Sequence, residues 1–74
     1  MTDLDRLVLD FANLQFRDSR VERAEIRRRF SWTRTYYFLR LNALIDTRDA
    51  QRYAPLTCHR YQSLREAGRS RPSD

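Results

Sequence analysis

The sequence contains very few of the residues that break helices or cross-link chains. Its 74 residues include one glycine, two prolines and one cysteine. So few chain-breaking residues argue against a fold of many β-turns and favour helices with short connections. Cys58 is the single cysteine, so no intramolecular disulfide can form, and only one histidine, His59, accompanies it. A structural zinc site needs four ligands, so we expect no metal, and we interpret Cys58 as a small buried side chain.

Lysine is absent, and all 15 basic residues are arginine. The formal net charge is +5 and the sequence pI is about 10.3. A genome rich in G and C could explain the preference for arginine over lysine, but not the excess of positive charge. A basic domain attracts polyanions, and the planar donor fork of arginine suits phosphates and guanine edges. The charge balance therefore favours a nucleic-acid partner.

Long apolar runs and catalytic motifs are also lacking. No apolar stretch approaches the length of a membrane-spanning helix, and we expect no membrane association. The sequence begins without a recognisable signal peptide, and with a single cysteine this predicts a reducing, cytoplasmic location. No nucleophile motif surrounds any serine, so we expect no catalytic residues, no enzyme activity and no cofactor.

The first helix is expected over residues 3–16. Thr2 can cap it, and Asp3 and Asp5 lie in its first turn, where the helix dipole favours negative charge. Apolar residues recur at helical spacing and predict one buried face made of Leu4, Leu7, Val8, Phe11 and Leu14.

A second helix is expected over residues 20–29. Ser19, followed three residues later by Glu22, matches a capping box at its start. Its predicted apolar contacts are Val21, Ala24, Ile26 and, at its end, Phe30.

Thr33 is a plausible cap for a third helix over residues 34–46. Its helical wheel places Tyr37, Leu41, Leu44 and Ile45 on the buried side and Thr35, Leu39, Asn42 and Ala43 on the exposed side. We interpret Trp32, just before it, as a core residue.

The remaining residues complete an all-α prediction. A polar connector with at most one helical turn is expected from Asp46 to Tyr53, and Pro55 suits the first turn of a fourth helix. The fold class is a small three-helix helix-turn-helix bundle with a C-terminal fourth helix. A single domain covers residues 1–66, with the helix-turn-helix unit at 20–46, and residues 67–74 are predicted to be a flexible tail.

Two helices joined by a turn of three or four residues are typical of DNA-binding helix-turn-helix units. The second helix of such a unit enters the major groove. We therefore predict binding of double-stranded DNA, with Arg34, Thr35 and Asn42 near bases and Thr33 and Tyr36 beside them. The arginines predicted to contact phosphates are Arg27, Arg28, Arg29 and Arg40. A specific binder this small would usually form a homodimer.

Several blocks of the sequence resemble a family of small actinobacterial and actinophage proteins that is catalogued as a domain of unknown function and described as helix-turn-helix-like. The resemblance begins near Leu9 and Phe11 and covers most of the chain. It is carried by Ala24-Glu25-Ile26-Arg27-Arg28-Arg29-Phe30, Thr33-Arg34-Thr35-Tyr36-Tyr37, Leu41-Asn42-Ala43-Leu44-Ile45-Asp46, Pro55-Leu56 and the segment from Arg60 to Arg65. The Leu-Asn-Ala-Leu-Ile-Asp block is the most specific of these.

This resemblance implies a helix-turn-helix fold and a role in transcription regulation, without an established mechanism. The chain departs from the family pattern at Ser31, where glycine is usual, and in the segment Tyr36-Tyr37-Phe38-Leu39, where Arg-Tyr-Tyr-Gln is usual. Leu39 offers apolar contact in place of the hydrogen bonds of glutamine.

An apolar residue on the exposed side of the third helix supports a second hypothesis. An exposed apolar spot can mark a protein interface. The chain could bind a component of the transcription machinery or, if the gene is phage-borne, another host protein. The predicted contact residues for this alternative are Tyr36, Leu39 and Ala43.

Overall fold

The computed structural model describes residues 1–14 and 16–70, and this part of the chain holds five helices and no strand. The helices are α1 (Asp3–Ala12), α2 (Ser19–Phe30), α3 (Arg34–Leu44), α4 (Arg48–Tyr53) and α5 (Pro55–Ser70). The all-α prediction is confirmed. The predicted connector before Pro55 folds as α4. Residues 67–70 of the expected tail belong to α5, and residues 71–74 lie outside the described residues.

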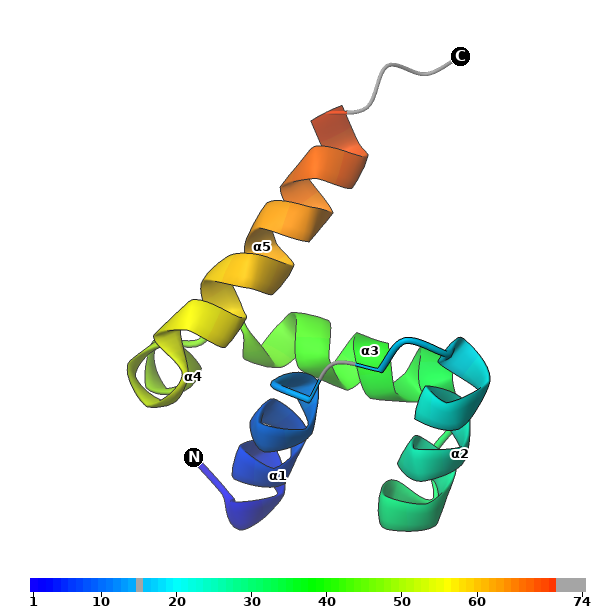
Figure 1. Cartoon of the computed structure of the whole chain (residues 1–74). Coiled ribbons are helices and arrows are strands. Elements are labelled where there is room, and N and C mark those ends of the chain that lie inside the picture. Colours follow the sequence, from blue (N-terminus) through cyan, green and yellow to red (C-terminus); the bar gives the residue numbers. More distant parts are fainter. Residues whose placement is uncertain (15, 71–74) are drawn as a thin grey trace.

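The third helix, α3, joins the first two helices in the packing of the molecule. It packs against α1 and α2, while α4 joins α1 to α5. In Figure 1, α1 and α2 both lie below α3, and α5 extends upward, away from the other helices. None of the helices in the described part of the chain is long and apolar enough to cross a membrane.

The core lies where α1, α2 and α3 meet. The ring of Phe11 from α1 contacts both Phe30 from α2 and Tyr37 from α3, with ring centroids 5.7 and 5.2 Å apart. The Tyr37 hydroxyl donates a buried hydrogen bond of 2.7 Å to the carbonyl oxygen of Val8. The fully buried apolar residues are Val8, Leu9, Phe11, Ala12, Ile26, Tyr37, Leu41, Ile45, Ala50 and Cys58.

Several helix starts agree with the sequence prediction. Thr2 caps α1 in a capping box with Asp5, Thr33 caps α3 by accepting from the Tyr36 amide, and Pro55 is the first residue of α5. The cap predicted for α2 is wrong, because Asp18 is the capping residue and its carboxylate accepts from the Arg20 amide. The helix therefore includes Ser19.

The predicted face of α1 is partly wrong. Leu4, Leu7 and Leu14 are exposed, whereas Leu9 and Ala12 are buried. α1 packs against both α3 and α4, so its buried arc is set by two neighbours. The helix also ends at Ala12 and not at residue 16.

The chain after α1 turns so that Phe16 stacks on Phe11, with ring centroids 5.3 Å apart. In α2, Val21 and Ala24 are exposed against expectation, and Ile26 is fully buried as predicted. In α3, the predicted burial of Tyr37, Leu41 and Ile45 is confirmed, although the helix ends at Leu44 and not at 46.

Candidate nucleic-acid interface

The turn between α2 and α3 is set by local backbone geometry. Ser31 adopts a left-handed conformation, with φ of 59° and ψ of 29°, and it is the one non-glycine residue with positive φ among those described. This conformation favours glycine, which has no Cβ. Thr33 then begins α3, and its hydroxyl satisfies the Tyr36 amide. The amides of Arg34 and Thr35, in the first turn, have no helical acceptor.

The three adjacent arginines at the end of α2 have different environments. Arg28 and Arg29 both form ion pairs with Glu25, at 2.8 and 3.2 Å. The hydrogen bond from Arg28 holds the pKa of Glu25 below its ordinary value. Arg27 lies on another side of the helix and forms no ion pair with any described residue. Arg28 and Arg29, which the sequence predicted to contact phosphates together with Arg27, are therefore already paired within the protein.

Arg27 belongs instead to a row of three arginines along one side of α2. Arg20, Arg23 and Arg27, here called the arginine stripe, are spaced three and four residues apart and so share one side of the helix. Arg23 and Arg27 have no acidic partner among the described residues, and Arg20 has a 3.5 Å contact with Asp18 on a side chain that is 86% exposed. Such an exposed contact contributes little.

The arginine stripe faces the beginning of α3 across a groove of about 460 Å³. The same groove is lined by Trp32 and by the first residues of the α3 helix, Thr33, Arg34 and Thr35. Unpaired guanidinium groups and the amides at the start of a helix thus meet in one concavity, which suits an anion. Sequence reasoning missed Arg20 and Arg23, although their helical spacing with Arg27 was visible.

Arg34 is held by contacts within the protein. Its Nε donates to the Glu22 carboxylate at 2.6 Å, and its guanidinium lies over the Phe38 ring, 4.8 Å from the centroid. The Glu22 side chain is 17% exposed, so this ion pair is partly shielded from water. The Nη groups of Arg34 take no part in this bond, and its side chain remains 44% exposed.

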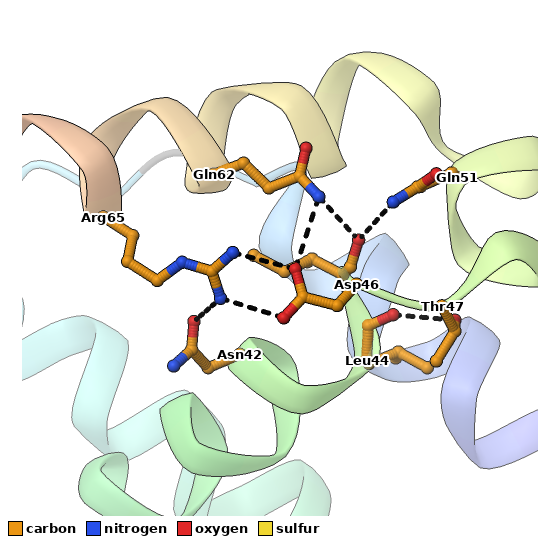
Figure 2. A network of polar contacts seen from close by, with 8 residues as sticks. Asn42, Leu44, Asp46, Thr47, Gln51, Gln62 and Arg65 are labelled. Atoms are coloured by element: carbon orange, nitrogen blue, oxygen red, sulfur yellow. Dashed lines mark hydrogen bonds and ion pairs between the residues drawn. The ribbon is translucent and has the colours of Figure 1, made fainter.

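Asn42 is also engaged. Its side-chain oxygen accepts a hydrogen bond of 3.1 Å from Arg65 on α5 (Figure 2), which leaves its amide group as the remaining donor. Arg40 lies over the Trp32 ring at 5.7 Å and forms no ion pair with a described residue. Tyr36 is exposed, as predicted, and touches Trp32 edge-on, while Trp32 is half-buried against Phe30.

The outer side of α3 is accessible as its helical wheel predicted. Thr35, Leu39 and Ala43 are all exposed. The predicted site residues therefore separate into two sets. Arg27, Thr33, Arg34 and Thr35 line the groove with the arginine stripe, whereas Arg28 and Arg29 do not line it and pair with Glu25.

Two other kinds of site, a metal site and a reactive cysteine, have little support in the described residues. They contain no group of three or more His, Cys, Asp or Glu side chains that could hold a metal ion. Cys58 is fully buried, and burial raises the pKa of its thiol, which disfavours the reactive thiolate. His59, beside it, is exposed.

The sequence matches a family model over residues 1–72, and that family is described as "Protein of unknown function (DUF3263)". The chain belongs to this family. Neither a curated protein nor a solved structure gives a significant match to the chain. The family's description carries no activity, so the function of this member has to be inferred from its own residues.

Proposed function

We propose that this member of the family binds double-stranded DNA, with backbone phosphates seated between the arginine stripe and the first turn of α3. The observation that carries the proposal is that Arg23 and Arg27, without acidic partners among the described residues, line the same groove as the start of α3. Phosphate contacts from arginine and from helix amides supply most of the affinity of DNA-binding domains.

The arrangement of α2 and α3 supports a helix-turn-helix mode of binding. The helices are separated by residues 31–33, a length typical of that motif. In this mode α3 enters the major groove, with Thr35, Tyr36 and Leu39 on the side that meets the bases. The arginine stripe then contacts the flanking backbone and fixes the orientation of α3.

Weak sequence specificity follows from the same contacts. Arg34 is engaged by Glu22, and Asn42 is engaged by Arg65, so two of the predicted base-reading side chains have lost part of their free hydrogen-bonding capacity. Leu39 can make only apolar contact with a thymine methyl, and Thr35 has a single hydroxyl with which to hydrogen-bond a base edge. We therefore propose a transcription regulator of low intrinsic specificity, acting in the cytoplasm, whose footprint would be extended by dimerisation.

Fluorescence anisotropy of a labelled random-sequence duplex across a salt series tests the proposal. We expect binding at low salt, with an affinity that falls linearly on a log–log plot, because each phosphate contact releases condensed counterions. Absence of binding at low salt, where these contacts are strongest, would show that the positive charge does not serve DNA.

A further inference from the structure

A second groove lies between α3 and α5. It has a volume of about 600 Å³ and is here called the α3–α5 groove. Half-buried Phe38 and Tyr61 contribute to its lining, with buried Leu41 and two exposed leucines, Leu39 from α3 and Leu64 from α5. α5 extends away from the other helices (Figure 1), and the groove is lined by residues of α3 and α5.

Both of these leucines expose most of their side chains to solvent, so the core does not depend on their being apolar. Leu39 is 64% exposed and Leu64 is 59% exposed, and they come from different helices. Polar residues at these positions would keep the groove hydrated at no cost to the core. Two exposed leucines in one concavity are instead typical of surfaces that are covered by an apolar partner.

The charges of the α3–α5 groove restrict the partner. Its lining includes Arg34 and Arg65 and no acidic residue. Arg34 and Thr35 also line the groove that holds the arginine stripe, so the two concavities adjoin. Arg34 is paired with Glu22 and Arg65 with Asp46, but the Nη groups of Arg34 take no part in its bond to Glu22. Arg23 and Arg27 of the adjoining arginine stripe have no acidic partner among the described residues. A partner in the α3–α5 groove thus meets positive charge where the groove borders the arginine stripe, and a negatively charged surface is electrostatically complementary there.

We propose that the α3–α5 groove docks an amphipathic, acidic α-helix of a protein partner. The leucines of such a helix would cover Leu39 and Leu64, and its carboxylates would face Arg34 and the adjoining arginine stripe. The α5 helix of a second copy fits less well, because it carries three arginines, Arg60, Arg65 and Arg69, and a single acid, Glu66. DNA fits less well, because a duplex docked on α3 would cover Leu39 but offers no apolar surface to Leu64 on α5. This groove differs from the protein interface predicted from the sequence, because Leu39 lines it but Tyr36 and Ala43 do not.

A designed peptide tests the proposal on the full chain. The probe is a helix of about four turns with leucines on one face and glutamates elsewhere, and isotope-labelled protein is followed by two-dimensional NMR. We expect saturable shifts of the amides of Phe38, Leu39 and Leu64. Leu64→Gln should weaken binding about tenfold, since a buried leucine is lost. Leu56→Gln, on the same helix but outside the groove and 83% exposed, should leave binding unchanged.

Control peptides distinguish the sources of binding. A peptide with the same residues but scattered leucines, and one with lysine in place of glutamate, should each bind at least about tenfold more weakly. Equal binding of the peptide with scattered leucines would show that charge alone drives binding, and this would overturn the proposal. The absence of NMR shifts at the groove would also overturn it. If the protein alone forms a dimer and Leu64→Gln dissociates it, the occupant of the groove is a second copy of this chain and not an acidic helix. DNA binding of Leu64→Gln is expected to be normal, so failure of this proposal and failure of the proposed function are distinguishable.

Discussion

Arg65 on α5 donates two hydrogen bonds to the carboxylate of Asp46, at 2.8 and 3.0 Å, and a third to Asn42 on α3 at 3.1 Å. Gln62 and Gln51 donate to the carbonyl oxygen of Ile45 in the same network (Figure 2). The hydrogen bonds to Asp46 raise the pKa of Arg65 above its ordinary value. These contacts fasten α5 to the end of α3.

The junction gives a physical meaning to the Leu-Asn-Ala-Leu-Ile-Asp block. Leu41 and Ile45 are buried in the core, while Asn42 and Asp46, one turn apart, both accept from Arg65. We had expected Asn42 to approach bases. Its position in this network indicates that the block holds two helices together, and this role is independent of any DNA contact.

The first prediction concerns this junction. Asp46→Asn should lower the free energy of unfolding, because a charge-assisted pair with Arg65 is lost at a site that is only partly shielded from water. Glu66→Gln, on an exposed residue of α5 that raises the pKa of Arg65 less than Asp46 does and forms no hydrogen bond with it, should have a smaller effect. Urea unfolding measures both. Equal stability of the two variants would mean that the Arg65 contacts contribute nothing.

The second prediction concerns the turn at Ser31. Ser31→Gly should stabilise the protein by about 0.5 kcal/mol, because relief of the left-handed strain exceeds the added entropy of the unfolded chain. Ser63→Gly, in the interior of α5, should instead destabilise it by about 0.5 kcal/mol. Thermal unfolding followed by circular dichroism gives the sign of each change. Destabilisation by both glycines would contradict the strain at Ser31.

The third prediction concerns Tyr37. Tyr37→Phe removes its bond to the Val8 carbonyl and should cost about 1 kcal/mol, whereas Tyr36→Phe on the surface should cost less than about 0.5 kcal/mol. Chemical unfolding of the two variants at neutral pH compares these losses.

Burial also makes the contribution of Tyr37 depend on pH. Burial raises the pKa of the Tyr37 hydroxyl far above its ordinary value of 10.0. A raised folded pKa means that this contribution is complete below pH 10.0 and is lost as the pH rises above it. Unfolding measured across alkaline pH should show a decline that is smaller in Tyr37→Phe. An identical decline in both proteins would contradict this assignment.

The parts of the fold that sequence reasoning predicted are those fixed by neighbours along the chain. The caps Thr2 and Thr33 and the buried side of α3 depend on residues within one or two turns. The face of α1 was not predictable in the same way, because Leu9 and Ala12 are buried by helices that are distant in sequence. Leu7, which the helical wheel favoured, is 57% exposed.

The candidate interface was predicted in part for the same reason. The sequence indicated basic residues on α2 and the start of α3. Arg28 and Arg29 follow Glu25 by three and four residues, a helical spacing that permits their ion pairs, whereas Arg27 follows it by only two. The engagement of Asn42 by Arg65 joins residues far apart in the sequence. That pairing follows from tertiary structure alone.

The most direct test of the central claim compares Arg27→Gln with Arg28→Gln in DNA binding across a salt series. The two residues are adjacent and the charge change is the same, but Arg27 lines the groove at the start of α3 and Arg28 is paired with Glu25. We predict that Arg27→Gln weakens binding and reduces the log–log salt slope by about 1, while Arg28→Gln leaves the slope unchanged. Equal effects of the two variants would show that DNA responds to net charge alone and would contradict a phosphate site at the arginine stripe.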